Sequence, residues 1–465
     1  MQSRSRALRV LMLLLAFALV ASSCGGRDDD SGGGGGNGGD NGGENGGGGG
    51  GDGGFSVDTA DCPDNDTAGI SDDNVITLAS SFPQSGLTAA FAQISKGYIA
   101  YFDKINAEGG VTIDGEQYTI EVEHKDDEYQ SARTIQNIDE LVGQDGDGAF
   151  AVFNVVGTAN NIAIRDDLHE NCVPNLFAAT GSSSWGNPEY PWLVGSTLAP
   201  YSIEAAAYAD WLKENQPEAQ VAMLVQDDDF GQTYEESFRK AIEGSDITVT
   251  EVATYPTGTN EVATQVTSLA ASGADAFFNG STLLACPNAL TEAASINWER
   301  ESTFVSGTCI SKTLTGLAGE AADDILAVTN TMDPVNPEYA DDPVMAEYLQ
   351  TLEEYADADV DPENGIVAYG YTQAAIFVHV LENAESASRS AVLNSLRNID
   401  TDGIGMMVPG AVLKMSEDDA FLAENVQLVQ YNYVSEDEAY FENVGEILDF
   451  EGQTSELTPP ELINN

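Results

Sequence analysis

The sequence has few basic residues. Its 17 lysine and arginine residues stand against 77 aspartate and glutamate residues, which gives a net charge of −60 at pH 7. Such a surface repels phosphate groups, so nucleic acid and anionic lipid are excluded as electrostatic partners. A metal-storage protein would cluster its acidic residues, whereas outside residues 25–54 they are spread along this chain. We interpret the charge as a solvated acidic surface suited to a salty medium, in which dissolved ions screen the self-repulsion.

The chain also lacks the common motifs of catalysis. It contains no HExxH, GxSxG or P-loop pattern. The three histidines, His124, His169 and His379, are far apart, and we interpret each as structural. No CxxC pair indicates zinc, and the DGDG stretch at 145–148 lacks the other ligands of a calcium loop. We therefore expect neither enzymatic activity nor a cofactor or metal.

The N-terminus has the pattern of an export signal. Arginines precede an apolar run at residues 10–20 that is too short to span a bilayer, and small residues lead to Cys24. The stretch ALVASSC resembles a bacterial lipobox, in which Cys24 is lipidated, although Ala21 stands where such signals prefer leucine. We therefore predict a lipoprotein signal peptide over residues 1–24. The alternative is an ordinary secretory signal with Cys24 lost or idle. Both interpretations predict export.

A low-complexity segment follows the signal. Residues 25–54 are almost entirely glycine with aspartate, asparagine and glutamate. Such a segment buries too little apolar surface to offset the entropy cost of ordering, so we predict a disordered tether, extended to residue 61. No later segment is long and apolar enough to cross a membrane. Residues 62–465 suffice for two lobes with separate cores.

Strand and helix patterns alternate through the rest of the chain. The series opens with a strand at 75–78, a loop at 81–88 and a helix pattern at 91–105 that stops at Gly109 and Gly110. Two successive strand–helix series predict two similar parallel-sheet α/β lobes. The further predicted strands are 118–124, 149–156, 173–177, 221–225, 247–252, 274–279, 303–305, 325–329 and 425–433, and the further predicted helices are 126–142, 160–169, 233–243, 261–271, 283–295, 343–355 and 364–383.

Four cysteines remain once Cys24 is assigned to the export signal. An even number in an exported chain favours disulfides. Cys62 and Cys172 each lie just before a predicted strand, and Cys286 and Cys309 flank one helix and the strand after it. We predict the pairs Cys62–Cys172 and Cys286–Cys309; the alternative is four free thiols.

An ordered set of segments between residues 74 and 375 resembles the type I periplasmic binding proteins of branched-chain amino acid ABC transporters. The matching segments are SFPQSGLTAAF, GYIAYFDKINAEGGV, DDEY, ELV, VGTANNIAI, CVPNLFAATG, QDDDFG and AYGYTQAA. The resemblance implies two lobes joined by a three-strand hinge, with residues 62–199 and 327–405 in lobe 1 and 200–326 and 406–465 in lobe 2.

The same resemblance implies a function and a place in the cell. We expect a monomeric solute-binding lipoprotein of an ABC importer that delivers an amino acid or a related small carboxylate-bearing solute to a permease. A lipid anchor would hold it to a membrane outside the cytoplasm, in the periplasm or on the outer face of the cytoplasmic membrane. The alternative is a sensor subunit that reports ligand occupancy to a membrane receptor. An extracellular hydrolase is disfavoured by the missing nucleophile motifs.

Three loops of lobe 1 are expected to face the cleft between the lobes, because ligands of open α/β sheets bind at the carboxyl ends of the strands. Free backbone N–H groups together with hydroxyl groups form an anion site, although such residues also cap helices. The resemblance implies that these loops hold a ligand carboxylate. The candidate residues are Phe82, Ser85, Gly157, Thr158, Thr180, Gly181 and Ser182.

Lobe 2 offers the candidates Phe230, Ser281, Thr282 and Thr308. Phe230 matches an aromatic residue that covers the ligand in the family, and its other role would be core packing. The family also places a carboxylate for the ligand ammonium near Gly307, where this sequence reads FVSGTC without an acid. Either an acid at 227–229 substitutes, or the ligand is not a standard α-amino acid. Trp185 either lines the cleft or packs beneath its loop.

Overall fold

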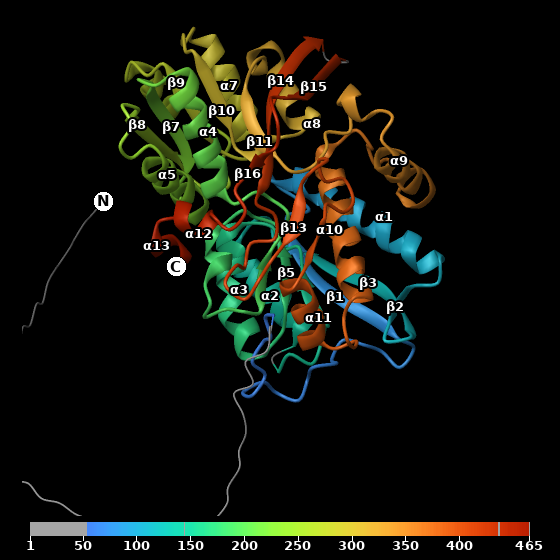
Figure 1. The fold of residues 1–465 in the computed structure, drawn as a ribbon. Helices are drawn as coiled ribbons and strands as arrows, with labels where there is room; N and C mark the ends of the chain where they lie inside the picture. The colour runs from blue at the N-terminus through green and yellow to red at the C-terminus, as the bar shows by residue number, and fades with distance from the viewer. Residues whose placement is uncertain (1–53, 144, 436–437, 465) are drawn as a thin grey trace, which may run out of the picture. The chain divides into compact units, whose positions relative to one another are not determined.

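Two β-sheets organise the part of the chain that the computed structural model describes, residues 54–143, 145–435 and 438–464 (Figure 1). In Figure 1 the elements of the first sheet run from blue to teal and those of the second from green to yellow, and the last elements of the chain return to both. The predicted signal peptide, Cys24 and the tether up to residue 53 lie outside the described residues.

The first sheet has six strands in the order β2-β3-β1-β4-β5-β6. β1 pairs in parallel with β3 and β4, whereas the edge strand β2 is antiparallel to β3. β4 is shorter than the predicted strand 149–156, because Asn154 takes a positive φ of 55° that ends it. The strands are β1 (Val75–Phe82), β2 (Val111–Ile113), β3 (Glu116–Asp126), β4 (Ala151–Phe153), β5 (Asn175–Ala178) and β6 (Leu193–Gly195).

Helices from both ends of the chain contribute to the core of this sheet. Two glycines let α1 and α10 pack closely: a Cβ atom on Gly97 would lie 2.0 Å from the Val367 carbonyl oxygen, and one on Gly370 would lie 2.0 Å from that of Ile94. The helices of this half are η1 (Ala89–Ala92), α1 (Gln93–Ala107), α2 (Ser131–Val142), α3 (Thr158–Glu170), η2 (Ser183–Gly186), η5 (Pro337–Tyr339), α9 (Pro343–Tyr355), α10 (Gly365–Glu382) and α11 (Arg389–Arg397).

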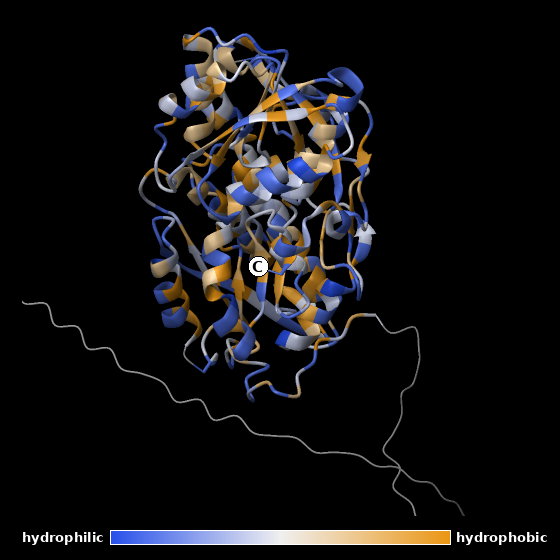
Figure 2. Ribbon diagram, turned by 90° about the vertical axis from the view of Figure 1, so that its left-hand side faces the viewer, coloured by the Kyte–Doolittle hydropathy of each residue, from blue (hydrophilic) through white to orange (hydrophobic). Residues whose placement is uncertain are grey.

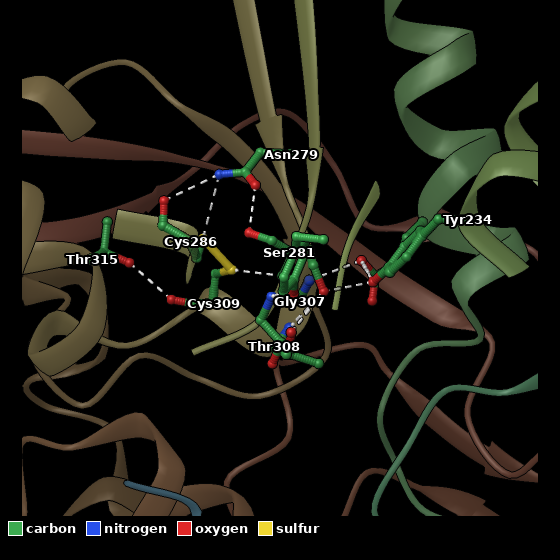
Figure 3. Close-up of a disulfide and its surroundings, with 12 residues drawn as sticks. Tyr234, Asn279, Ser281, Cys286, Gly307, Thr308, Cys309 and Thr315 are labelled. Carbon is green, nitrogen blue, oxygen red and sulfur yellow. Dashed lines mark hydrogen bonds between the residues drawn. A yellow bond between two sulfur atoms is a disulfide. The ribbon is translucent and has the colours of Figure 1, made fainter. Parts of the chain in front are cut away.

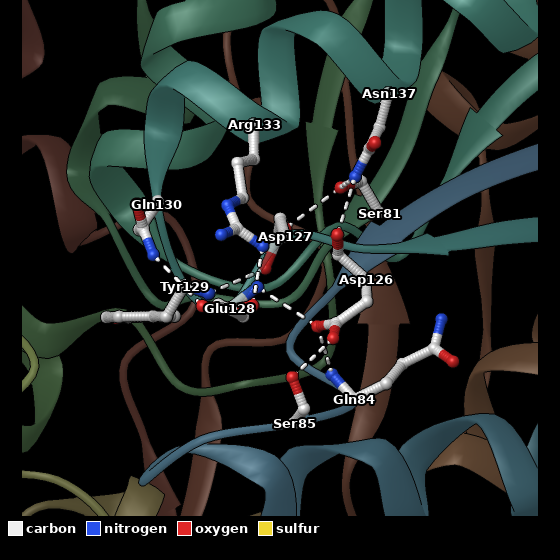
Figure 4. Close-up of polar contacts among 10 residues, drawn as sticks. All are labelled: Ser81, Gln84, Ser85, Asp126, Asp127, Glu128, Tyr129, Gln130, Arg133 and Asn137. Carbon is white, nitrogen blue, oxygen red and sulfur yellow. Dashed lines mark hydrogen bonds and ion pairs between the residues drawn. The ribbon is translucent and has the colours of Figure 1, made fainter.

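The start of α2 differs from the prediction. We expected Asp126 and Asp127 to open this helix, but β3 continues to Asp126 and the helix begins only at Ser131. Asp126 accepts hydrogen bonds from the Gln84 amide at 2.8 Å and the Ser85 hydroxyl at 2.5 Å, and Asp127 accepts one from the Tyr129 amide at 2.8 Å (Figure 4). These bonds hold a tight turn whose middle residues have positive φ, so the aspartates fix the loops at the end of the strands.

The second sheet has the order β15-β14-β11-β10-β9-β7-β8, with β16 beside β14. Its strands β7 to β11 are parallel, and β14 joins antiparallel to β11, so the predicted late strand lies in this sheet as expected. The strands are β7 (Gln220–Gln226), β8 (Thr248–Tyr255), β9 (Ala276–Gly280), β10 (Ser302–Val305), β11 (Leu326–Thr329), β14 (Asn425–Ser435), β15 (Glu438–Asn443) and β16 (Leu448–Asp449).

One long helix of this half was not predicted. α4 (Tyr201–Asn215) is buried on every side over its first nine residues, so it shows no amphipathic period of 3.6 residues. The other helices here are α5 (Asp229–Ala241), α6 (Ala263–Ala271), α7 (Ala285–Ser295), η3 (Gly307–Cys309), α8 (Lys312–Thr315), η4 (Gly316–Ala322), α12 (Thr454–Leu457) and α13 (Pro460–Ile463).

Three chain segments pass between the sheets and are hydrogen-bonded to one another. The Asn330 side chain donates to the Thr197 carbonyl oxygen. The Val408 amide donates to the Asn330 carbonyl at 2.9 Å, and the Met332 amide to that of Met406 at 2.7 Å. The third segment adjoins a small ribbon of β12 (Asp400–Asp402) and β13 (Val412–Lys414). The crossings are therefore hydrogen-bonded neighbours rather than separate linkers, and the second and third pair antiparallel at Thr331 and Met407.

Both predicted disulfides are confirmed. Cys62 bonds to Cys172, and Cys286 bonds to Cys309 (Figure 3). The ordered chain begins before Cys62, because the Asn398 side chain donates to the Phe55 carbonyl at 2.7 Å.

The interior of each half is apolar, as Figure 2 shows by the orange residues of the strands and the blue residues of the outer loops and helix turns. In the first half, the rings of Phe102, Phe153 and Phe377 pack together, and in the second those of Tyr208, Phe278 and Phe304. Across the described residues, no helix combines the length and the hydrophobicity that a membrane span requires.

Candidate ligand-binding site

A cavity lies where the carboxyl ends of both sheets meet the crossing segments. It encloses about 860 Å³ of empty space, counting its part open to solvent. Parallel strands of both sheets end here, which is where open α/β folds place their ligands. The lining residues are Phe91, Ile94, Val156, Ala179, Leu198, Ala199, Glu204, Gly307, Thr308, Ile310, Ser311, Val328, Thr329, Asn330, Thr331, Met332, Asp333, Gly365, Ile366 and Tyr369.

The lining combines an apolar wall with two acids. Most of the lining side chains are aliphatic or aromatic, and the charged ones are Glu204 and Asp333. Among the described residues that line the cavity, none is lysine, arginine or histidine. The site therefore offers negative charge and apolar surface, and it lacks the side chains that usually pair with a carboxylate.

Glu204 enters the cavity from the first turn of α4 and has no exposed surface. Its Oε2 atom accepts hydrogen bonds from the Tyr234 hydroxyl and the Gly307 amide, both at 2.8 Å. Its Oε1 atom has no hydrogen-bond partner among the described residues. Figure 3 shows Tyr234 reaching from α5 toward the turn at Gly307 and Thr308. One carboxylate oxygen is thus held in place and the other is left free.

Glycine is required at position 307 by this arrangement. A Cβ atom there would lie 2.7 Å from Oε1 of Glu204, which is shorter than any normal contact. The missing side chain leaves the space that the Glu204 carboxylate occupies. The stretch FVSGTC thus carries no acid of its own but receives one from α4.

Burial sets the protonation of both cavity acids. It raises the pKa of Glu204 to about 8, although the bonds from Gly307 and Tyr234 act in the opposite direction. It raises the pKa of Asp333 to about 6, against the lowering effect of the amides of Phe441 and Val335. Both shifts reflect the cost of burying an ionised carboxylate, and at Asp333 the positive charge of Lys312 offsets part of this cost.

The predicted binding residues fall into separate groups. Thr308 lines the cavity, and none of the other predicted residues, all of which the structure describes, belongs to its lining. Phe82 is buried in the core of the first half, where its ring lies 5.3 Å from that of His124. Ser85 is exposed and donates to Asp126.

The hydroxyl loops of the first half lie just behind the cavity wall, since Val156 and Ala179 line it. The Thr158 and Thr180 hydroxyls are 2.6 Å apart, and Thr180 is 3.1 Å from the Tyr201 hydroxyl. Ser182 bonds to Ser184, and Gly181 accepts from the Tyr201 amide at 2.8 Å. Gly157 has φ 102°, and a Cβ atom there would lie 2.7 Å from the Tyr129 ring.

The other predicted residues of the second half, Phe230, Ser281 and Thr282, are buried. The Phe230 ring packs edge-on against Tyr201 and Tyr234, the two aromatic residues beside Glu204. Ser281 donates to Asn279 at 2.6 Å, and the Thr282 amide donates to the Tyr255 hydroxyl at 3.1 Å. Trp185 packs beneath its loop, where its indole N–H donates to the Thr180 carbonyl.

Sequence reasoning missed Glu204. We weighed the acids at 227–229 as substitutes, but these lie beside a different, more open hollow at the start of α5. A signal for Glu204 was nonetheless present, because it is the one charged residue in the apolar stretch YSIEAAAYA, where an unpaired acid is costly.

One cluster of carboxylates in the described chain has the spacing of a metal site. Oxygen atoms of Asp419, Glu424 and Glu451 lie within 4.8 Å of one another. Glu424 already accepts from the amides of Gly452 at 2.6 Å and Thr454 at 2.9 Å, and Glu451 pairs with Lys414 at 3.3 Å. These partners account for the cluster, so we assign no metal to it.

A family model described as periplasmic binding protein matches residues 75–438 of the chain. The chain belongs to this family. Its members bind solutes for transporters and are not enzymes. The predicted type I fold with two α/β lobes is thereby confirmed.

Relatives of this periplasmic binding protein are distant. Leu/Ile/Val-binding protein homolog 3 of Brucella melitensis is 27% identical over 207 residues, which cover 44% of this chain and 54% of that protein. The match therefore spans about half the length of that relative. A branched-chain amino acid ABC transporter structure from Thermus thermophilus with bound valine has 17% identity and a TM-score of 0.70, covering 82% of this chain and 98% of that one.

Another structural neighbour carries a ligand without an ammonium group. It is a solute-binding protein of an ABC transporter from Rhodopseudomonas palustris in complex with 3,4-dihydroxybenzoic acid, with 17% identity and a TM-score of 0.67, covering 81% of this chain and 98% of that one. At such identity these likenesses show the fold alone. The solute of this periplasmic binding protein must be argued from its own cavity.

Proposed function

We propose that this chain is the solute-binding lipoprotein of an ABC importer and that it captures an amino acid or a related small carboxylate-bearing solute in the cavity described above. The observation that carries the proposal is the lining of that cavity, which draws on the strand ends of both sheets and on two crossing segments. A solute held there would contact both lobes at once, so its binding would favour their closure about the crossings.

The lobes are proposed to divide at 62–199 with 327–405 and at 200–326 with 406–465. The crossings at Thr197, Asn330 and Met406 support a hinge near these boundaries, because hydrogen bonds join the three segments. Thr158, Thr180 and Ser182 remain the proposed partners of the solute carboxylate. They would have to exchange their present hydrogen bonds, which join Thr158 to Thr180 and Ser182 to Ser184, for bonds to the ligand.

The N-terminus supports an anchored location outside the cytoplasm. Lipidation of Cys24 would attach the chain to a membrane, and the glycine-rich tether would let the lobes reach a permease. Mass spectrometry of the exported protein tests this. A diacylglyceryl group on Cys24 is expected, and an unmodified N-terminus would favour the ordinary secretory signal.

The binding function is tested by thermal unfolding of the exported protein with amino acids, amides and short organic acids at high salt. A ligand present at a hundred times its dissociation constant adds about 2.7 kcal/mol to the free energy of unfolding, which raises the melting temperature clearly. A flat response to the whole panel would contradict the proposal. Uptake of the active compound should be lost on gene deletion; intact uptake with a lost signalling response would favour the sensor alternative.

A further inference from the structure

We propose that Oε1 of Glu204 accepts a hydrogen bond from an ammonium group of the bound solute, so that the solute class is an amine with an apolar body and not a plain carboxylic acid. This inference rests on the proposed function, because it concerns the ligand of the same cavity.

The geometry of the carboxylate carries the first step. The Gly307 amide and the Tyr234 hydroxyl orient Oε2 at 2.8 Å each, so the side chain cannot turn away without breaking both hydrogen bonds. The other oxygen, Oε1, lies in the space that the missing side chain of Gly307 leaves, and both residues line the cavity. A buried acceptor in a fixed position without a donor in the described chain is a site prepared for a donor from outside.

The charge of the cavity carries the second step. Glu204 and Asp333 are its charged lining residues, and no basic residue of the described chain lines it. Asp333 already accepts from the Phe441 amide at 2.9 Å and the Val335 amide at 3.2 Å, whereas Glu204 keeps a free oxygen. A ligand ammonium would pair with the ionised form of Glu204, whereas a ligand carboxylate without an ammonium would add to the negative charge of Asp333, which is mainly ionised at neutral pH because its pKa is about 6.

The apolar lining carries the third step, since it selects the body of the ligand. Phe91, Ile94, Val328 and Ile366 surround the space beyond the acids. Such a wall favours an aliphatic or aromatic group over a polar one. The combination describes a small amine with a hydrophobic side chain, and a carboxylate on the same molecule is permitted but not required.

Protonation gives the proposal a second observable. Since burial raises the pKa of Glu204 to about 8, the empty site is protonated at neutral pH, and an ammonium ligand must displace that proton. Binding should strengthen by up to about tenfold per pH unit from pH 6 to 8 and level off above. The titratable groups facing the carboxylate or sharing its cavity are Tyr201, Tyr234, Tyr369 and Asp333; the tyrosines stay neutral over this range because burial raises the pKa of each.

The experiment uses compounds that differ in one group. L-leucine, 4-methylpentanoate and 3-methylbutylamine share one apolar body. L-leucine carries an ammonium and a carboxylate, 4-methylpentanoate carries only the carboxylate, and 3-methylbutylamine carries only the ammonium. Matched sets built on valine and phenylalanine extend the range of body size. Binding to the exported full chain is measured by calorimetry. We expect members with an ammonium to bind, and to bind more tightly as pH rises to 8, and members without one to bind weakly.

The variant Glu204→Gln keeps the size of the side chain and an oxygen for Gly307 and Tyr234 while it removes the charge. We expect this variant to lower the affinity for ammonium-bearing compounds roughly tenfold to a hundredfold and to abolish the pH dependence of their binding. The matched control is Glu424→Gln, because Glu424 is a buried glutamate that does not line the cavity and that accepts from the Gly452 and Thr454 amides; this variant should leave both properties unchanged. If Glu204→Gln does not fold, Glu204→Asp serves instead. It keeps the charge on a shorter side chain and should lower the affinity for the same compounds.

Each outcome decides a different point. Binding only of compounds that lack an ammonium would overturn the inference and leave the proposed function standing. The same holds if ammonium-bearing compounds bind to Glu204→Gln as tightly as to the wild type, or if Glu424→Gln weakens their binding as much as Glu204→Gln does. No binding of any member, together with no response to the broader solute panel, would overturn the proposed function and the inference with it.

Discussion

The Tyr234 hydroxyl on α5 donates a hydrogen bond of 2.8 Å to Oε2 of Glu204 on α4, and neither side chain is exposed. The same hydroxyl lies 2.7 Å from that of Ser306, in the turn that follows β10. One phenol group thus links two helices and the end of a central strand beside the cavity. Removal of the Tyr234 hydroxyl would therefore affect the stability of the fold and the orientation of the Glu204 carboxylate, which we assign to the ligand ammonium.

Tyr234→Phe is expected to lower the free energy of unfolding by about 1–3 kcal/mol, because it leaves buried groups without a hydrogen-bond partner. Urea unfolding measures the change. Tyr431→Phe is the matched control, because the Tyr431 hydroxyl is buried without a partner among the described residues, and its loss should have little effect. Equal effects of the two variants would show that the Tyr234 bond contributes no net stability.

The stability of the ligand-free protein should depend on pH through Glu204. Burial raises the pKa of this group to about 8 in the folded state, whereas an unfolded glutamate titrates near 4.3. Between these values the folded state holds a proton that the unfolded state has lost, so the free energy of unfolding falls as pH rises, by up to about 1.4 kcal/mol per unit, and is flat above 8. The decline is present only in this window.

Glu204→Gln isolates this contribution from that of the other acids. Relative to wild type, the variant should become progressively more stable from pH 5 to pH 8, as measured by urea unfolding at each pH. Parallel pH profiles of the two proteins would show that Glu204 keeps an ordinary pKa in the folded state.

The two disulfides should differ in their effect on stability. Cys62–Cys172 closes a separation of 110 residues and Cys286–Cys309 one of 23, so the chain-entropy model assigns them about 5 and about 3 kcal/mol. Paired serine variants of each bond, unfolded in urea, measure both values. A larger loss at Cys286–Cys309 would show that native packing around this bond outweighs loop closure.

The carboxylate assignment is tested by Thr180→Val combined with Ser182→Ala. If these hydroxyls hold the ligand carboxylate, L-leucine should bind at least about tenfold more weakly, while 3-methylbutylamine, which lacks a carboxylate, should be unaffected. Thr180 also bonds to Thr158 and Tyr201, so the melting temperature of the empty variant is recorded as the control. Unchanged leucine affinity would remove the assignment.

The acidic surface predicts a dependence on salt. With a net charge of −60, the folded chain repels itself, and added ions reduce this repulsion more in the compact state than in the expanded one. The melting temperature should therefore rise as KCl is raised from about 0.1 M to above 1 M. A flat profile would show that the acidic residues impose no such cost.

Local patterns made much of the fold predictable. The apolar run at 149–156 predicted a strand buried on both faces, and the helix at 343–355 was predicted at its observed bounds. Both predictions succeeded because strand and helix periods depend only on near neighbours in the chain. The disulfide partners followed from the positions of four cysteines relative to those elements. Boundaries were less accurate where side chains bond across loops, as Asp126 does with Gln84 and Ser85.

By itself, the sequence determined that the chain is strongly acidic and built from two strand–helix series, since composition and periodicity are properties of the chain alone, and its N-terminal pattern predicted export. The acid at the cavity was decided only by the tertiary structure. Glu204 and Gly307 are 103 residues apart, and they meet because α4 is buried against the end of β10. A helix buried on every side has no period to reveal which residue faces a ligand, so the role of Glu204 emerges only from packing.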